Sequence, residues 1–347
     1  MRIALRVVGY GLLAAAIVLL PFTLGEFRVT QFTYVGVFAI ALMGLSILTG
    51  ITGQISLGHG GFMAVGAYVT AILSVNHDVP DLLTIPLGGL VAGVVGFLFG
   101  FPALRLAGVY LALATFALAV IVPSVASAAG SFTGGTAGIL LDLPTSPIGR
   151  LTPDKWLYFV TWGIAAALFV LALIFLRGKR GRALRAVRES ELAAVSSGIS
   201  LANYKTLAFG VSAFYAGIAG SLYAILNFIV TPGTFPVTLS ILLLAGLVIG
   251  GAGSLLGVLA GAAFVEFLPL YAGDVLRPVI NAGQRLGFPV NDVDPTTPGV
   301  PSVVYGAILL IVLIAMPNGA AGLVRRVGAL TKQVYSRQNP SESRVTP

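Results

Sequence analysis

The side chains in this sequence that could bind or react with another molecule occur in three places. Residues 53–62 form a polar, glycine-rich segment that contains Gln54, Ser56 and His59 and lies between two apolar runs. A single carboxylate, Glu266, lies inside another apolar run, and a basic segment occupies residues 177–205. Amide, hydroxyl, imidazole and carboxylate groups in apolar surroundings are suited to hydrogen bonding with a polar solute.

The residue types that are absent exclude several kinds of chemistry. The chain has no cysteine, which removes disulfides, thiolate nucleophiles and Cys-based metal sites. Neither of its two histidines, His59 and His77, belongs to an HExxH motif, and no GxxxxGK(S/T) phosphate loop is present. We therefore expect no enzyme activity, no metal site and no cofactor on this chain, so that any ATP and magnesium would be bound by a partner.

The composition identifies the surroundings of these residues. Of the 347 residues, 57% are apolar and only 9% are charged, whereas roughly a quarter of the residues in a soluble domain are charged. Uncharged apolar runs predict an all-α integral membrane protein with about ten transmembrane helices. The runs lie at residues 7–25, 33–50, 61–75, 84–101, 107–127, 156–176, 206–226, 237–250, 254–271 and 301–316.

The basic residues indicate how these spans are oriented. The net charge is +8, and 15 of the 20 Lys and Arg residues fall on one side if the N-terminus is cytoplasmic. The positive-inside rule then places both termini in the cytoplasm. The basic charge is thus a topology signal, and we expect no nucleic-acid partner.

The polar segment near residues 50–62 has two interpretations. A glycine-rich polar stretch is tolerated at membrane depth only where it is buried in protein or lines a wet cavity, which predicts a broken or re-entrant segment with Gln54, Ser56 and His59 on a solute path. Alternatively, it is a short cytoplasmic turn whose polar side chains are solvated. His59 lacks the companions that a metal site needs.

Glu266 is similarly ambiguous. A carboxylate inside a span is a functional candidate, but the expected direction of span 254–271 places it near the outer interface, where water would solvate it. The outer turn 231–236 follows the seventh span as the break follows the second. This spacing fits an inverted five-plus-five arrangement of the spans.

Glycines recur at helical spacing in two of the spans. Gly89, Gly93, Gly96 and Gly100 would line one helical face, and a second row runs from Gly246 to Gly261. Small residues let helix backbones approach closely inside a bilayer. We interpret both rows as helix-packing surfaces.

The basic segment 177–205 is the longest cytoplasmic loop expected between spans. Leu184, Val187, Leu192 and Val195 are spaced for short helices with one apolar side, and Gly198 is suited to ending such a helix. The positive charge alone would attract anionic lipid head groups. The apolar side is an additional feature that topology does not require.

The residues of this loop resemble the coupling motif of ABC-importer permeases, specifically the branched-chain amino acid permease family of the LivM type. The similarity covers roughly residues 30–320. The segments that carry it are GRA at 181–183, RE at 188–189, Ala193 and Gly198-Ile199, GQISLGHGGFMAVGAY at 53–68, FPALRLAGVYLALAT at 101–115, TGGTAGI at 133–139, LAFGVSAFYAGIAGSLYA at 207–224 and GGAGSLLG at 250–257.

The resemblance implies a permease subunit that imports branched-chain or other hydrophobic amino acids by ATP-driven alternating access. It implies as partners a homologous second permease subunit, two ATP-binding subunits, an extracytoplasmic substrate-binding protein and membrane lipid. Contact with the ATPase would fall to Gly181, Arg182, Arg188, Glu189, Glu191, Ala193 and Gly198. Gln54 and Ser56 would line the path, with His59 and Glu266 as further candidates.

The predicted organisation is one polytopic membrane domain, residues 1–320, with outer loops 128–155 and 273–300 and a cytoplasmic tail 321–347. Three alternative functions stay open. Related permeases carry urea or short amides, others carry sugars or nucleosides, and an ion-coupled secondary transporter would use intramembrane acidic residues, for which Glu266 is the one clear candidate.

Overall fold

The computed structural model describes residues 15, 17–104, 106, 108–143, 146, 149, 151–285, 306 and 310, without the side chains of Ala103 and residues 272–285. About half of the first predicted span and nearly all of the last lie outside these residues, as do most of the outer loop 273–300 and the tail 321–347. The domain assignment for those parts stays a prediction.

The described chain is helical, with one short pair of strands. The elements are α2 (Glu26–Leu45), η1 (Ser46–Ile51), α3 (His59–His77), α4 (Asp81–Ala103), α5 (Val109–Ala128), α6 (Gly130–Thr133), β1 (Ile139–Leu140), α7 (Pro153–Arg177), α8 (Lys179–Glu189), α9 (Glu191–Ser196), α10 (Leu201–Asn227), β2 (Ile229–Val230), η2 (Pro232–Thr234), α11 (Val237–Gly250) and α12 (Gly257–Arg285). Strands β1 and β2 are antiparallel, with Ile139 opposite Val230.

The predicted apolar runs correspond to helices. The eight runs from 33–50 to 254–271 fall on α2, α3, α4, α5, α7, α10, α11 and α12. Within the described residues, six helices are long and apolar enough to cross a membrane, and Gly257–Tyr271 is a shorter apolar helix. The multi-pass prediction is therefore confirmed, whereas the count of ten spans and the inverted arrangement stay predictions.

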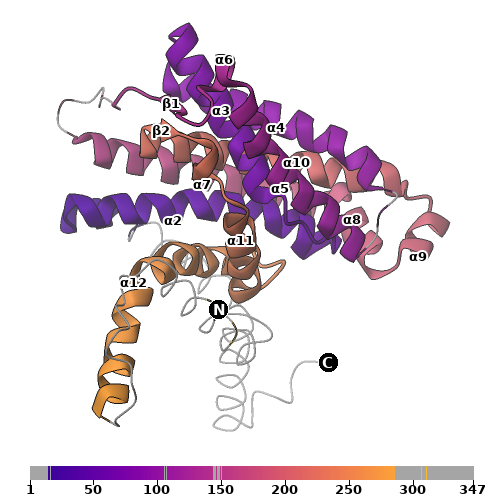
Figure 1. Cartoon of the computed structure of the whole chain (residues 1–347). Helices are drawn as coiled ribbons and strands as arrows, with labels where there is room; N and C mark the ends of the chain where they lie inside the picture. Colours follow the sequence, from indigo (N-terminus) through magenta and orange to yellow (C-terminus); the bar gives the residue numbers. More distant parts are fainter. Residues whose placement is uncertain are drawn as a thin grey trace.

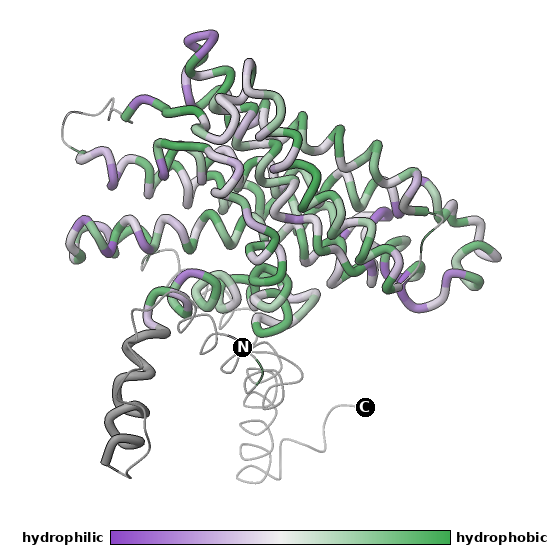
Figure 2. The backbone as a smooth tube through the Cα atoms, viewed as in Figure 1, coloured by the Kyte–Doolittle hydropathy of each residue, from purple (hydrophilic) through white to green (hydrophobic). Residues whose placement is uncertain are grey.

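Helices α2 and α10 form the centre of the described body. They are buried over most of their length, while α4, α5 and α7 expose most of theirs. Because the exposed side chains of the outer helices are apolar, they suit contact with lipid or another membrane subunit. Figure 2 shows the hydrophilic residues gathered towards the ends of the helices, with hydrophobic residues between them.

The glycine row of α4 packs against α10. A Cβ atom on Gly89 would lie 2.6 Å from the Ile218 side chain, and one on Gly100 would lie 2.9 Å from the Thr206 backbone. Such approaches leave no room for a larger residue, so the close contact of the two backbones requires glycine. The packing interpretation of this row is confirmed.

Candidate functional site

The basic loop folds as two short helices at one end of the helical body. Helix α8 follows α7 directly, and α9 lies at the far tip of the loop, beyond the ends of the long helices (Figure 1). The Ser190 hydroxyl caps α9 by accepting from the backbone N–H of Ala193 at 3.3 Å. Gly198 follows α9 with φ of +77°, where glycine is favoured. The predicted helices and the Gly198 stop are confirmed.

The two helices use their apolar residues differently. Leu184 and Val187 of α8 are 0% and 2% exposed, whereas Leu192 and Val195 of α9 are 84% and 54% exposed. The expectation of one apolar side holds for both helices. In α9 the two large apolar residues face outward and are not covered by any part of the chain that the structure describes.

Helix α8 is fixed to the body by its buried face. Leu184 belongs to a buried cluster with Leu48 and Ile51 of η1 and Leu176 of α7. A Cβ atom on Gly181 would overlap the Leu176 backbone, so the sharp connection from α7 to α8 requires glycine at this position. The first turns of α8 are thus built into the membrane domain.

The remaining loop residues expected to contact an ATPase lie on the surface. Arg182, Glu189 and Ala193 are exposed, and Arg182 donates to the Arg177 carbonyl at 3.4 Å. Glu191 forms an ion pair with Lys205 of α10 at 2.7 Å. This pair connects α9 to the start of the next long helix.

Arg188 connects the loop to the polar break. Its guanidinium donates a hydrogen bond to the Gly50 carbonyl, which lies in the π-helical turn η1. The Arg188 side chain also lies 3.3 Å from where a Cβ atom on Gly53 would be, and Gly53 has φ of +75°. One side chain of α8 therefore contacts both sides of the point where the helix ends.

Residues 53–58 are the predicted interruption. They lie between the end of the helix at Thr52 and the start of α3 at His59, and they are not helical. Exposure alternates along this segment: Gly53 and Ile55 are exposed, whereas Gln54 and Ser56 are buried. The open face of the break is therefore apolar, and the predicted path residues point inward.

The buried polar groups of the break bond to their own chain. The Gln54 side chain donates to the Thr52 hydroxyl at 3.1 Å, and the Thr49 hydroxyl donates to the Gln54 carbonyl at 3.0 Å. The Ser56 hydroxyl accepts from the Gly58 N–H at 3.4 Å. Gln54 and Ser56 thus stabilise the two ends of the interruption.

His59 is also used internally. It is fully buried, and its Nε2 lies 2.8 Å from the Ala41 carbonyl. Since a carbonyl can only accept, Nε2 carries the proton. Among the residues with described side chains, no group of three or more His, Cys, Asp or Glu could hold a metal ion.

Two hydroxyl groups hold the start of α3 in place, and the sequence pattern did not reveal them. The Leu57 N–H donates to the Thr115 hydroxyl of α5 at 2.9 Å, and the Gly60 N–H donates to the Ser240 hydroxyl of α11 at 2.9 Å. Orphan N–H groups at a helix start need such acceptors when no water is present. Lone Thr and Ser residues in apolar runs carry no signal of this role.

Glu266 lies in a different place. It is half-buried on α12 and interacts electrostatically with Tyr34 of α2 and Tyr223 of α10. The rings of Tyr34 and Tyr223 are 5.6 Å apart. Within the described residues, no hydrogen bond or ion pair joins Glu266 to the break, so the four predicted path residues do not form one cluster.

Known proteins similar to this chain point to one family. Residues 28–313 match the family described as "Branched-chain amino acid transport system / permease component". The chain is 35% identical over 267 residues to "High-affinity branched-chain amino acid transport system permease protein LivM" of Escherichia coli (strain K12), and to the protein of the same name from Salmonella typhimurium.

These alignments cover 70% of this chain and 63% of each relative, so the chain matches less than two thirds of the length of these relatives. No solved structure matches the chain. The family match covers most of the described helices, the break and the α8–α9 loop. The chain therefore belongs to the branched-chain amino acid transport permease family.

Proposed function

We propose that this chain is the permease subunit of an ABC importer for branched-chain or other hydrophobic amino acids in the bacterial plasma membrane. The observation that carries the proposal is the α8–α9 loop, which exposes Leu192 and Val195 at its tip and is bonded through Arg188 to the break. A loop with an apolar outer surface and a rigid connection to the membrane domain is suited to receiving a force from a partner.

The geometry supports a specific route for that force. An ATP-binding subunit that contacts α9 would displace α8, because Glu189, Ser190 and Glu191 join the two helices without a spacer. Leu184 and Arg188 would transmit the displacement to η1, since both contact that turn. Residues 53–58 and the start of α3 would then shift, opening the path alternately to the two sides. ATP and magnesium would supply the energy on the partner subunits.

π-Helical turns favour such a role. They are rare, and they occur frequently at functional sites. Here the π-turn contains Gly50, which Arg188 of α8 contacts, and it lies just before the interruption. The break would therefore act as the moving part, with α2 as the fixed one.

The exposed face of the break indicates which kind of solute the chain would carry. Gly53 and Ile55 are the open residues, and an apolar surface with free backbone groups suits an amino acid with an aliphatic side chain. Gln54, Ser56 and His59 would contact a solute only after the segment rearranges. Urea, short amides, sugars and nucleosides are less well matched to an apolar face.

The ion-coupled alternative depends on Glu266. Its neighbours Tyr34 and Tyr223 would provide only phenol oxygens as further ligands for a cation. A coupling site normally gathers several carboxylates or carbonyls at a broken helix. We therefore prefer the ABC importer.

The proposal includes partners and topology. A homologous second permease, two ATP-binding subunits and an extracytoplasmic binding protein would complete the importer. Ten spans in an inverted five-plus-five arrangement, with both termini cytoplasmic, would place the α8–α9 loop on the ATPase side. The positive-inside charge bias supports this orientation.

Reconstitution tests the proposed function. The full chain, purified with its co-expressed partners and inserted into liposomes, should take up labelled leucine only when the binding protein and ATP are both present. The chain alone should not hydrolyse ATP. Uptake driven by a sodium or proton gradient without the ATP-binding subunits would contradict the proposal, and uptake of urea or ribose in preference to leucine would change the solute.

A further inference from the structure

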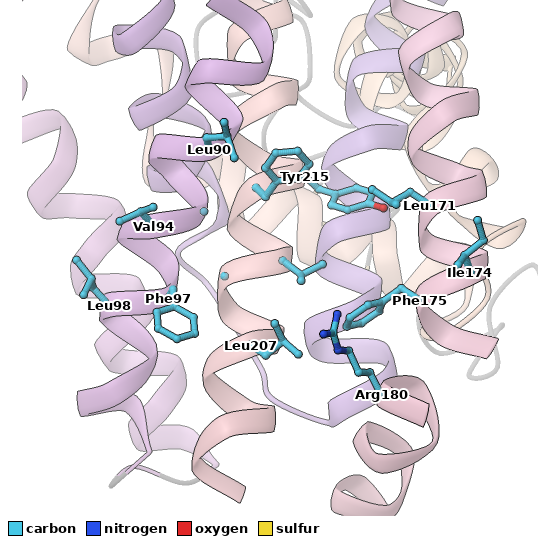
Figure 3. Close-up of a pocket in the computed structure, with 14 residues that line it drawn as sticks. Leu90, Val94, Phe97, Leu98, Leu171, Ile174, Phe175, Arg180, Leu207 and Tyr215 are labelled. Carbon is cyan, nitrogen blue, oxygen red and sulfur yellow. The ribbon is translucent and has the colours of Figure 1, made fainter. Parts of the chain in front are cut away.

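A long apolar groove lies on the outer face of the body, away from the break. It has a volume of about 550 Å³ and runs between α4 and α7, with α10 as its floor. Figure 3 shows Leu90, Val94 and Leu98 along one side, and Leu171 and Ile174 along the other. The walls belong to helices that qualify as membrane spans, so the groove is open to the bilayer.

Two facing glycines form part of the groove floor. Gly93 of α4 and Gly210 of α10 face one another, and a Cβ atom on either would lie 3.4 Å from the carbonyl of the other. The two helices therefore approach closely at this point, with the side chains of Phe97 and Phe214 beside the two glycines. Val94, Leu98 and Ile174 at the rim are strongly exposed, which leaves a large apolar surface for another molecule to cover.

Among the residues that the structure describes, one cation lines the groove, at one end. Arg180, in the first turn of α8, extends its guanidinium towards Phe175 and into the end of the groove (Figure 3). Arg182, Arg185 and Arg188 each donate to a backbone carbonyl. Arg180 has no hydrogen bond or ion pair with any residue that the structure describes, so its charge is free for a ligand.

The other basic residues near this end do not line the groove. Arg177 and Lys179 are exposed at the same end of α7, while the rest of the groove is lined by uncharged residues. A molecule that complements this surface is apolar along its length and anionic at one end. In a bilayer, an anionic phospholipid of the cytoplasmic leaflet has this form.

We propose that this groove binds an anionic phospholipid, with one acyl chain between α4 and α7 and the phosphate bound by Arg180. The site is separate from the solute path and goes beyond the proposed transport function. Arg180 also lies at the connection between α7 and α8, so that a bound phosphate holds this connection in place.

Lipid exchange tests the proposal directly. The purified full chain is exchanged into micelles with equal amounts of phosphatidylglycerol and phosphatidylcholine of matched acyl chains, and bound lipid is counted by native mass spectrometry. Wild type should retain phosphatidylglycerol in excess. Arg180→Gln should reduce that excess about fivefold, the effect of one basic residue on an anionic lipid.

Two further variants separate the parts of the site. Arg177→Gln is the matched control, because Arg177 is exposed at the same helix end but does not line the groove. It should change the lipid ratio less than about twofold. Val94→Trp fills the groove and leaves Arg180 intact, and it should reduce the binding of both lipids.

Two results would overturn the proposal. One is an equal loss of lipid preference in Arg180→Gln and Arg177→Gln, which would mean a diffuse charge effect. The other is cross-linking of a photoreactive residue at Val94 to a protein subunit, and not to lipid, in the assembled complex in native membranes. That result would assign the groove to a protein partner.

Discussion

Helices α8 and α9 are consecutive and only one residue apart, yet they have opposite relations to the rest of the described chain. Leu184 of α8 is buried against η1 and α7, whereas the two large apolar residues of α9, Leu192 and Val195, face outward. The first helix is therefore a structural part of the membrane domain, and the second is a surface available to a partner. The difference separates a helix that is fixed to the membrane domain from a helix on which, in the proposed function, an ATP-binding subunit would act.

The largest expected effect is a loss of folding stability when an apolar side chain is removed from α8 but not from α9. Leu184→Ala removes a fully buried side chain from the cluster with Leu48 and Ile51, which should lower the free energy of unfolding by about 2–5 kcal/mol. Leu192→Ala, the matched control, removes an exposed side chain and should change it by less than about 0.5 kcal/mol. Thermal denaturation of the two variants in detergent measures the difference, and equal shifts would mean that the two helices pack alike.

The next effect concerns the bond between α8 and the break. Arg188→Gln should leave assembly with the ATP-binding subunits intact but lower solute transported per ATP about tenfold, because a charge-assisted hydrogen bond is worth about 1.5–3 kcal/mol. Arg182→Gln is the control, since Arg182 bonds within its own loop. Arg188→Lys should restore part of the coupling. Wild-type transport per ATP in Arg188→Gln would show that the Arg188–Gly50 hydrogen bond does not couple the loop to the break.

The smallest effect tests how firmly α9 is held. Glu191→Gln removes the ion pair with Lys205. The Glu191 side chain is about half exposed in this pair. Such a surface pair is worth less than about 1 kcal/mol and is screened by salt. We expect a small loss of thermal stability that disappears at high salt, as a melting series across ionic strength would show. A large, salt-independent loss would mean that α9 depends on this pair.

Features that depend on neighbouring residues in the chain, such as helices, helix ends and the interruption, could be predicted from the sequence. The apolar runs identified eight helices because a span in lipid must be apolar over its whole length. Gly198 was recognisable as a helix stop because glycine readily adopts positive φ. The interruption at residues 53–58 was visible because polar, glycine-rich segments are exceptional at membrane depth.

The rest depends on contacts between distant residues. Arg188 and Gly50 are 138 positions apart, and no periodicity connects them. The pattern of α9 gives it an apolar side but does not say whether that side is covered. Likewise, the extended segment alternates its faces, so that Gln54 and Ser56 are buried and Gly53 and Ile55 are open. The role of Gln54 and Ser56 on a solute path stays a prediction.

Thiol labelling tests the central claim, that α9 is the surface which a partner covers. The chain contains no cysteine, so Leu192→Cys and Leu184→Cys each introduce a single reactive site. A maleimide should label Leu192→Cys rapidly and Leu184→Cys slowly in the purified chain. Adding the ATP-binding subunits should protect Leu192→Cys. Equal labelling of Leu192→Cys with and without these subunits, in a complex shown to be assembled, would contradict the account.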